Sequence, residues 1–106
     1  MAPFVGNRRS RPTPEMWRVV WTEEARENLI GIQAYVEQFN AIAAAKLAGR
    51  LIDSADRLEE MPDRGRPLRP GVRELVIVRP YRILYAVVGA EVRILSIRHT
   101  ARRPPE

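Results

Sequence analysis

The chain has 106 residues, of which 45 % are hydrophobic, and a net charge of +5, which suits one small domain with its own core. It has no cysteine, one histidine, no clustered carboxylates at ligand spacing and no glycine-rich phosphate loop. These features exclude disulfides and thiolate metal sites, and we expect no metal or cofactor and no small-molecule substrate. The apolar runs are too short to span a bilayer, so a cytoplasmic protein without a membrane partner is expected.

The positive charge is unevenly distributed along the chain. Residues 1–21 carry +3, residues 22–61 carry −4 and residues 62–106 carry +6. A basic half of this kind attracts polyanions, such as a nucleic acid or an acidic protein. Seventeen of the eighteen basic residues are arginines, a bias that the composition of the genome would also produce.

Residues 1–15 are predicted to be a disordered tail, because they contain three prolines and several arginines and have little to bury. They also lack the apolar segment of a signal peptide. The folded domain is expected to span residues 16–106, and Met16 is an alternative start of the natural product.

The first folded segment is predicted to be a short strand, residues 17–21, followed by a helix. Thr22 offers a hydroxyl N-cap, and Glu23 and Glu24 then lie in the first turn, where the helix dipole favours anions. Apolar side chains recur at steps of four and three residues, the spacing of a one-sided helix: Ala25, Leu29, Ile32, Val36 and Phe39.

A second amphipathic helix is predicted after a break at Asn40, and Pro62 is expected to stop it. Two such helices joined by a short break form a helical hairpin. The apolar positions of the second helix are Ala44, Leu47, Leu51, Ala55, Leu58 and Met61.

The remainder of the chain is predicted to be a turn followed by three strands. Residues 62–71 contain three prolines and two glycines and are expected to be turn material. The strands are expected at residues 73–79, 81–88 and 91–98, with Gly89-Ala90 as a type II′ hairpin turn. The order β-α-α-β-β-β predicts an α+β fold in which the helical hairpin packs on one face of a small, mainly antiparallel sheet, leaving the other face at least partly open.

Six short motifs occur in this order along the predicted elements, and the ordered set resembles the RelE/ParE toxin superfamily. No single motif is specific, but each falls in the matching structural position, and together they cover roughly residues 16–106. They are Val20 to Ala25 (VWTEEA), Leu29 to Tyr35, Pro62 to Arg66 (PDRGR), Arg73 to Leu75 (REL), Tyr81 to Tyr85 (YRILY) and Ile97 to Pro104 (IRHTARRP).

The resemblance implies the toxin of a type II toxin–antitoxin system, a growth inhibitor or plasmid-stabilisation protein silenced by a labile cognate antitoxin. ParE-like members bind DNA gyrase, whereas RelE-like members are ribosome-dependent mRNA endoribonucleases. A degenerate member that binds its antitoxin without toxicity is a third alternative. Fold alone does not choose among these functions.

Arg82 is the first residue singled out by the resemblance, because the arginine of the Y-R-x-x-Y motif stabilises phosphate charge in RelE-like nucleases. Strand alternation predicts that Arg82 projects from the sheet face opposite to Tyr81. The competing interpretation, slightly favoured, is a structural arginine that holds Glu74 on the neighbouring strand. If the protein is a nuclease, His99 is the candidate for proton transfer and Arg102 a further cation.

The nuclease alternative lacks several expected groups. The nuclease branch often has a tyrosine or a His–Tyr pair near its C-terminus and lysines on the strand after the helices, but here no tyrosine follows Tyr85 and the corresponding stretch carries only arginines. Because arginine is a poor proton shuttle, a ParE-like binding toxin without catalysis is favoured. The residues predicted to bind target or antitoxin are Arg66, Arg69, Arg73, Arg79, Arg82, Arg98, Arg102 and Arg103, and Tyr35 and Phe39 are interpreted as core or antitoxin contacts.

Overall fold

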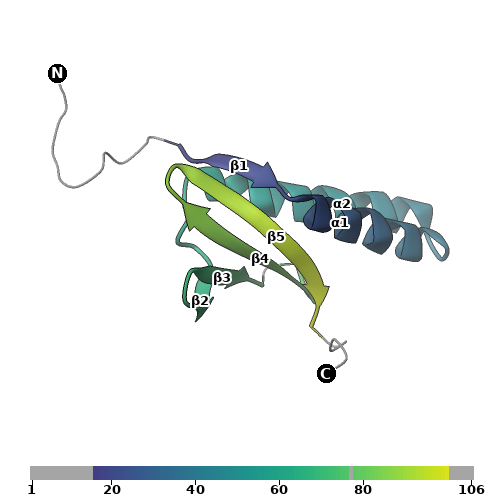
Figure 1. Cartoon of the computed structure of the whole chain (residues 1–106). Helices are drawn as coiled ribbons and strands as arrows, with labels where there is room; N and C mark the ends of the chain where they lie inside the picture. The colour runs from purple at the N-terminus through teal and green to yellow at the C-terminus, as the bar shows by residue number, and fades with distance from the viewer. Residues whose placement is uncertain (1–15, 77, 101–106) are drawn as a thin grey trace, which may run out of the picture.

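Two helices cover one side of a five-stranded mixed sheet, as Figure 1 shows. The strand order is β1-β5-β4-β3-β2, in which only the β1–β5 pair is parallel. The structure, a computed structural model, describes residues 16–76 and 78–100, so the predicted tail, Arg102 and Arg103 lie outside the described residues. The elements are β1 (Arg18–Trp21), α1 (Glu23–Glu37), α2 (Ala41–Asp56), the 3-10 turn η1 (Arg57–Glu59), β2 (Arg66–Arg69), β3 (Val72–Leu75), β4 (Tyr81–Val88) and β5 (Glu91–His99).

The predicted fold class and the two helix starts are confirmed. The Thr22 hydroxyl accepts a hydrogen bond from the Ala25 N–H at 3.1 Å, and the Asn40 side chain accepts one from the Ala43 N–H at 2.9 Å. Asn40 is therefore the N-cap of α2 as well as the break between the helices. The apolar stripe of α1 ends earlier than predicted, because α1 stops at Glu37 and Phe39 is 73 % exposed in the connection.

The predicted second helix is also shorter in the structure. α2 ends at Asp56 and tightens into η1, so Pro62 is not what stops it. Leu58 is still fully buried, but Met61 is exposed and does not belong to the apolar stripe.

The proline-rich stretch predicted to be only a turn contains a fourth C-terminal strand. β2 and β3 form a hairpin joined by Pro70 and Gly71, and Gly71 has the positive φ of 79° that such a turn requires. Pro67 is tolerated because β2 is an edge strand. The next strand is shorter than predicted, Val72–Leu75 in place of residues 73–79.

The core lies between the helices and one sheet face. It contains Tyr81, Ile83 and Tyr85 of β4 together with Leu51 and Leu58 from the helical layer. The opposite sheet face is not covered by either helix, and its alternating side chains form the surface that we call the open face (Figure 1). The open face comprises Arg18, Val20, Arg66, Arg69, Val72, Glu74, Arg82, Leu84, Ala86, Val88, Glu91, Arg93, Ser96 and Arg98.

A candidate interaction surface on the open sheet face

A bulge in β5 decides which side chains reach the open face. Tyr85 pairs with Ile94 and Leu84 pairs with Ser96, so Leu95 is the extra residue on β5. Both Ile94 and Ile97 consequently point into the core, although they are three residues apart. A one-residue shift of this kind moves all following side chains to the other face.

Side chains from the first helix region hold this bulge in place. The Asn28 side chain of α1 accepts a hydrogen bond from the Ile97 N–H at 3.0 Å. The Thr22 hydroxyl lies 2.7 Å from the Ile94 carbonyl and 3.1 Å from the Leu95 carbonyl. The backbone groups around the irregularity are therefore paired, which fixes the register of the strand end.

The bulge separates the two residues that a nuclease would need together. Arg98 lies directly opposite Arg82 on the open face, whereas His99 lies opposite Tyr81 on the helix side. The His99 and Tyr81 rings meet edge to face with their centroids 5.1 Å apart. Since Tyr81 is buried in the core, Arg82 and His99 project from opposite faces of the sheet.

Arg82 belongs to a group of three residues that we call the Glu74 cluster. The buried Glu74 carboxylate accepts a hydrogen bond from Arg82 Nη1 at 3.0 Å through one oxygen and from Arg66 Nη2 at 2.8 Å through the other. The structural ion pair expected between Arg82 and Glu74 is thus present. The Arg82 side chain is 30 % exposed, and its Nε is buried without a hydrogen-bond partner among the described residues.

A second arginine–glutamate–arginine group, the Glu91 cluster, lies at the other end of the open face. Glu91 pairs with Arg18 on β1 and accepts a hydrogen bond from Arg93 Nε at 3.0 Å. The hydrogen bonds from Arg18 and then Arg93 lower the pKa of the Glu91 carboxyl. This group was not predicted from the sequence, although the E-x-R spacing of Glu91 and Arg93 places both on one strand face.

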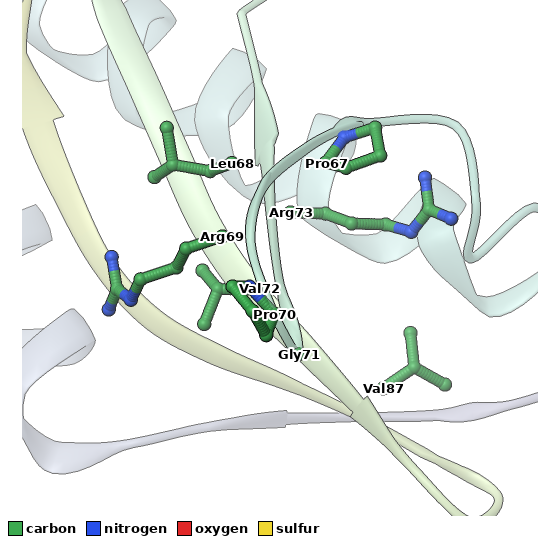
Figure 2. A pocket seen from close by; sticks show the side chains of 8 residues that line it. All are labelled: Pro67, Leu68, Arg69, Pro70, Gly71, Val72, Arg73 and Val87. Atoms are coloured by element: carbon green, nitrogen blue, oxygen red, sulfur yellow. The ribbon is translucent and has the colours of Figure 1, made fainter.

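The side chains of Arg69 and Arg73 in the β2–β3 hairpin do not point toward a common site. Figure 2 shows Arg69 and Arg73 extending in opposite directions from the hairpin, around a hollow of about 530 Å³ lined otherwise by proline, glycine and aliphatic residues. Arg73 donates to the Gly65 carbonyl at 2.6 Å and to the Asp63 carbonyl at 3.3 Å. Arg73 therefore holds the preceding loop in place. Arg79 lies in the β3–β4 connection.

Tyr85 joins two of the sequence motifs on the helix side. Its hydroxyl accepts a hydrogen bond from the Gly65 N–H and donates one to the Pro62 carbonyl, both at 2.8 Å. Burial raises the pKa of the Tyr85 phenol, partly offset by the Gly65 hydrogen bond. A Cβ on Gly65 would lie 2.7 Å from that hydroxyl and 2.8 Å from the Glu74 carbonyl oxygen, so only glycine fits against the tyrosine.

The end of the helical hairpin exposes apolar side chains that sequence reasoning had assigned to the core or to antitoxin contacts. Tyr35 and Phe39 stack edge to face at 5.4 Å, and they are 52 % and 73 % exposed. Ile42, in the first turn of α2, is 71 % exposed. These residues do not belong to the core, and their role as antitoxin contacts stays a prediction.

Within residues 16–76 and 78–100 the structure groups no three side chains that could hold a metal ion. No helix in the same part of the chain is both long and apolar enough to cross a membrane.

Comparison with known proteins identifies relatives of this architecture. The family described as the ParE toxin of the type II toxin–antitoxin system parDE matches residues 19–104. Toxin RelE2 of Caulobacter vibrioides is 47 % identical over 87 residues, which make up 82 % of this chain and 99 % of that protein. The Sinorhizobium fredii protein Y4kP is 37 % identical over 91 residues, covering 84 % of this chain and 94 % of that protein.

Solved structures share the same fold. A chain of the chromosomal ParDE toxin–antitoxin system from P. aeruginosa superposes with a TM-score of 0.74 at 27 % identity, covering 81 % of this chain and 98 % of that one. A chain of the toxin–antitoxin complex RelBE2 from Mycobacterium tuberculosis gives 0.62 at 24 % identity, covering 82 % and 94 %, which supports the fold alone. Fold and relatives together define a type II toxin of the RelE/ParE superfamily. Within that superfamily, the chain belongs to the ParE toxin family.

Proposed function

We propose that this toxin inhibits growth by binding DNA gyrase, without catalysing a reaction, and that a cognate antitoxin neutralises it in the cytoplasm. The observation that carries the proposal is the placement of Arg82 and His99 on opposite faces of the sheet. Acid–base cleavage of RNA needs a proton-transfer group and a phosphate-stabilising cation that both reach the same scissile phosphate within hydrogen-bond distance. A binding toxin has no such requirement.

The antitoxin partnership is supported by the solved relatives, which come from toxin–antitoxin complexes. Target and antitoxin contacts are proposed for the exposed arginines, with Arg98 and Arg69 on the open face and Arg79 in the β3–β4 connection. Arg66 and Arg82 are already paired with Glu74, so we propose that they contribute to binding only through the exposed parts of their side chains. Arg102 and Arg103 remain proposed contacts that lie outside the described residues.

The direct test is a supercoiling assay with purified gyrase and increasing amounts of this chain. Inhibition that rises with toxin and is relieved by the co-expressed antitoxin is the expected result. An Arg50→Gln variant is a suitable control and should inhibit gyrase as the original chain does, because Arg50 is exposed on α2, away from the open face. Unchanged supercoiling at saturating toxin would contradict the proposal.

An RNase acting on translated mRNA is the second candidate, because the relative that is 47 % identical carries the name RelE2. It predicts new 5′ ends in mRNA after induction and loss of toxicity in Arg82→Ala and His99→Ala variants. We expect both variants to stay toxic if they remain folded. Induction of the chain without antitoxin also tests the degenerate alternative, for which growth would be normal.

A further inference from the structure

The open face carries a positive charge that its own carboxylates do not neutralise. Among the described strand residues it bears six arginines and two glutamates, because Arg69 and Arg98 are added to the Glu74 and Glu91 clusters. Each glutamate is already shared by two arginines. Among the described strand residues, this face therefore has no unpaired carboxylate for Arg98.

The position of Arg98 makes an added anion favourable. Arg98 and Arg82 are directly opposed on neighbouring antiparallel strands, where Cβ atoms lie about 5 Å apart and like charges destabilise the pair. Arg98 is exposed at the end of β5, and Arg82 is partly exposed beside it. A carboxylate or phosphate between the two guanidinium groups would remove this repulsion.

One of the donors of Arg82, its Nε, also lacks an acceptor among the described residues. Glu74 engages its Nη1, whereas its Nε is buried with no partner among the described residues. A buried donor without an acceptor costs free energy, and cationic donors cost more than neutral ones. A small rotation of the guanidinium toward an arriving acceptor would recover that cost.

The rest of the open face favours a polypeptide over a nucleic acid. Single-stranded nucleic acids bind through aromatic side chains that stack on bases, and none of the described strand residues of the open face is aromatic. Val88 is 45 % exposed, and Val20 and Ala86 are half-buried. Apolar side chains of a bound polypeptide could therefore pack against these three residues.

We propose that the open face binds an extended acidic segment of the antitoxin, with Arg98 and Arg82 holding one carboxylate and the valines receiving apolar side chains. The proposal rests on the proposed antitoxin partnership, because that segment is part of the antitoxin. It assigns the decisive contact to Arg98, since Arg66 and Arg82 are already bound to Glu74.

The test measures binding of a fluorescent peptide in which glutamate alternates with alanine, and of an oligouridine with the same number of negative charges. The complete chain is compared with Arg98→Gln and with Arg50→Gln, the matched charge loss on the helix side. Thermal unfolding checks that both variants are folded, as expected for exposed side chains. We expect Arg98→Gln to weaken peptide binding about fivefold and Arg50→Gln less than about twofold at low salt.

Three results would overturn the proposal: no peptide binding by the unmodified chain, equal losses in the two variants, or oligouridine binding that is tighter than peptide binding and depends on Arg98. The assay contains no gyrase and measures no growth. A chain that binds the peptide but leaves gyrase active contradicts only the proposed function, and the converse result contradicts only the proposal about Arg98.

Discussion

The two faces of the sheet use polar side chains in different ways. On the helix side, Tyr85 is fully buried and its hydroxyl makes hydrogen bonds to the backbone of the loop before β2. On the open face, Glu74 and Glu91 each form ion pairs with two arginines. The helix side thus fixes a loop against the core. On the described strands of the open face, four arginines are paired with glutamates, and Arg69 and Arg98 lie outside these ion pairs.

This difference shows that arginine content alone does not identify a binding site in this protein. Of the arginines predicted to bind a partner, Arg66 and Arg82 hold Glu74 and Arg73 holds two loop carbonyls. These side chains have structural contacts that a substitution would break. Loss of toxicity after replacing them would therefore need a stability measurement before it is interpreted as loss of a binding contact.

The largest effect is expected for Gly65→Ala on the helix side. The new Cβ would lie within 3 Å of the Tyr85 hydroxyl and the Glu74 carbonyl oxygen, and backbone cannot easily move away. We expect the free energy of unfolding, measured with urea, to fall by about 3 kcal/mol. The control is Gly49→Ala in α2, where no atom lies within 4 Å and a gain of about 0.5 kcal/mol is expected. Similar changes at both positions would contradict the tight fit of Gly65 against Tyr85.

On the open face, Glu74→Gln should cost about 2 kcal/mol, because Arg66 and Arg82 lose the charge of their shared and buried partner. Urea unfolding at neutral pH measures the loss. Glu91→Gln is the matched control and should have a smaller effect, since the Glu91 side chain is 26 % exposed whereas that of Glu74 is 3 % exposed. If Glu91→Gln costs as much as Glu74→Gln, burial is not what distinguishes the two clusters.

Tyr85→Phe removes two hydrogen bonds and should cost about 1.5 kcal/mol near neutral pH. Because the folded-state pKa of Tyr85 is raised above the unfolded value, its contribution is complete below pH 10 and is lost as pH rises through the folded pKa. Urea unfolding across the alkaline range should therefore be less pH-dependent in Tyr85→Phe. Tyr35→Phe, at an exposed position, should keep the pH dependence of the original chain. An unchanged alkaline loss in Tyr85→Phe would assign that loss to another group.

Asn28→Ala tests the bulge in β5 that places Arg98 and His99 on opposite faces of the sheet. The substitution leaves the Ile97 N–H without its acceptor, and we expect a loss of about 1 kcal/mol. Hydrogen exchange at Ile97 should become faster, while exchange in the β1–β5 ladder stays the same. Unchanged exchange at Ile97 would mean that Asn28 does not stabilise the bulge.

Short-range patterns in the sequence predicted much of the fold. The caps at Thr22 and Asn40, the helical spacing from Ala25 and the turn at Gly89 all act within a few residues, so their physical causes can be read along the chain. The strand β2 was missed because proline-rich composition masks an edge strand whose hydrogen bonds come from β3.

The sequence by itself determined the helical hairpin, the alternating strands, the family and the residue types available for a site. Only the tertiary structure decided which of those residues meet. Regular alternation along β5 would put His99 on the open face and Arg98 in the core, but the extra residue at Leu95 reverses both. Such a shift depends on pairing with β4 and on a hydrogen bond from a distant helix, and neither leaves a local pattern in the chain.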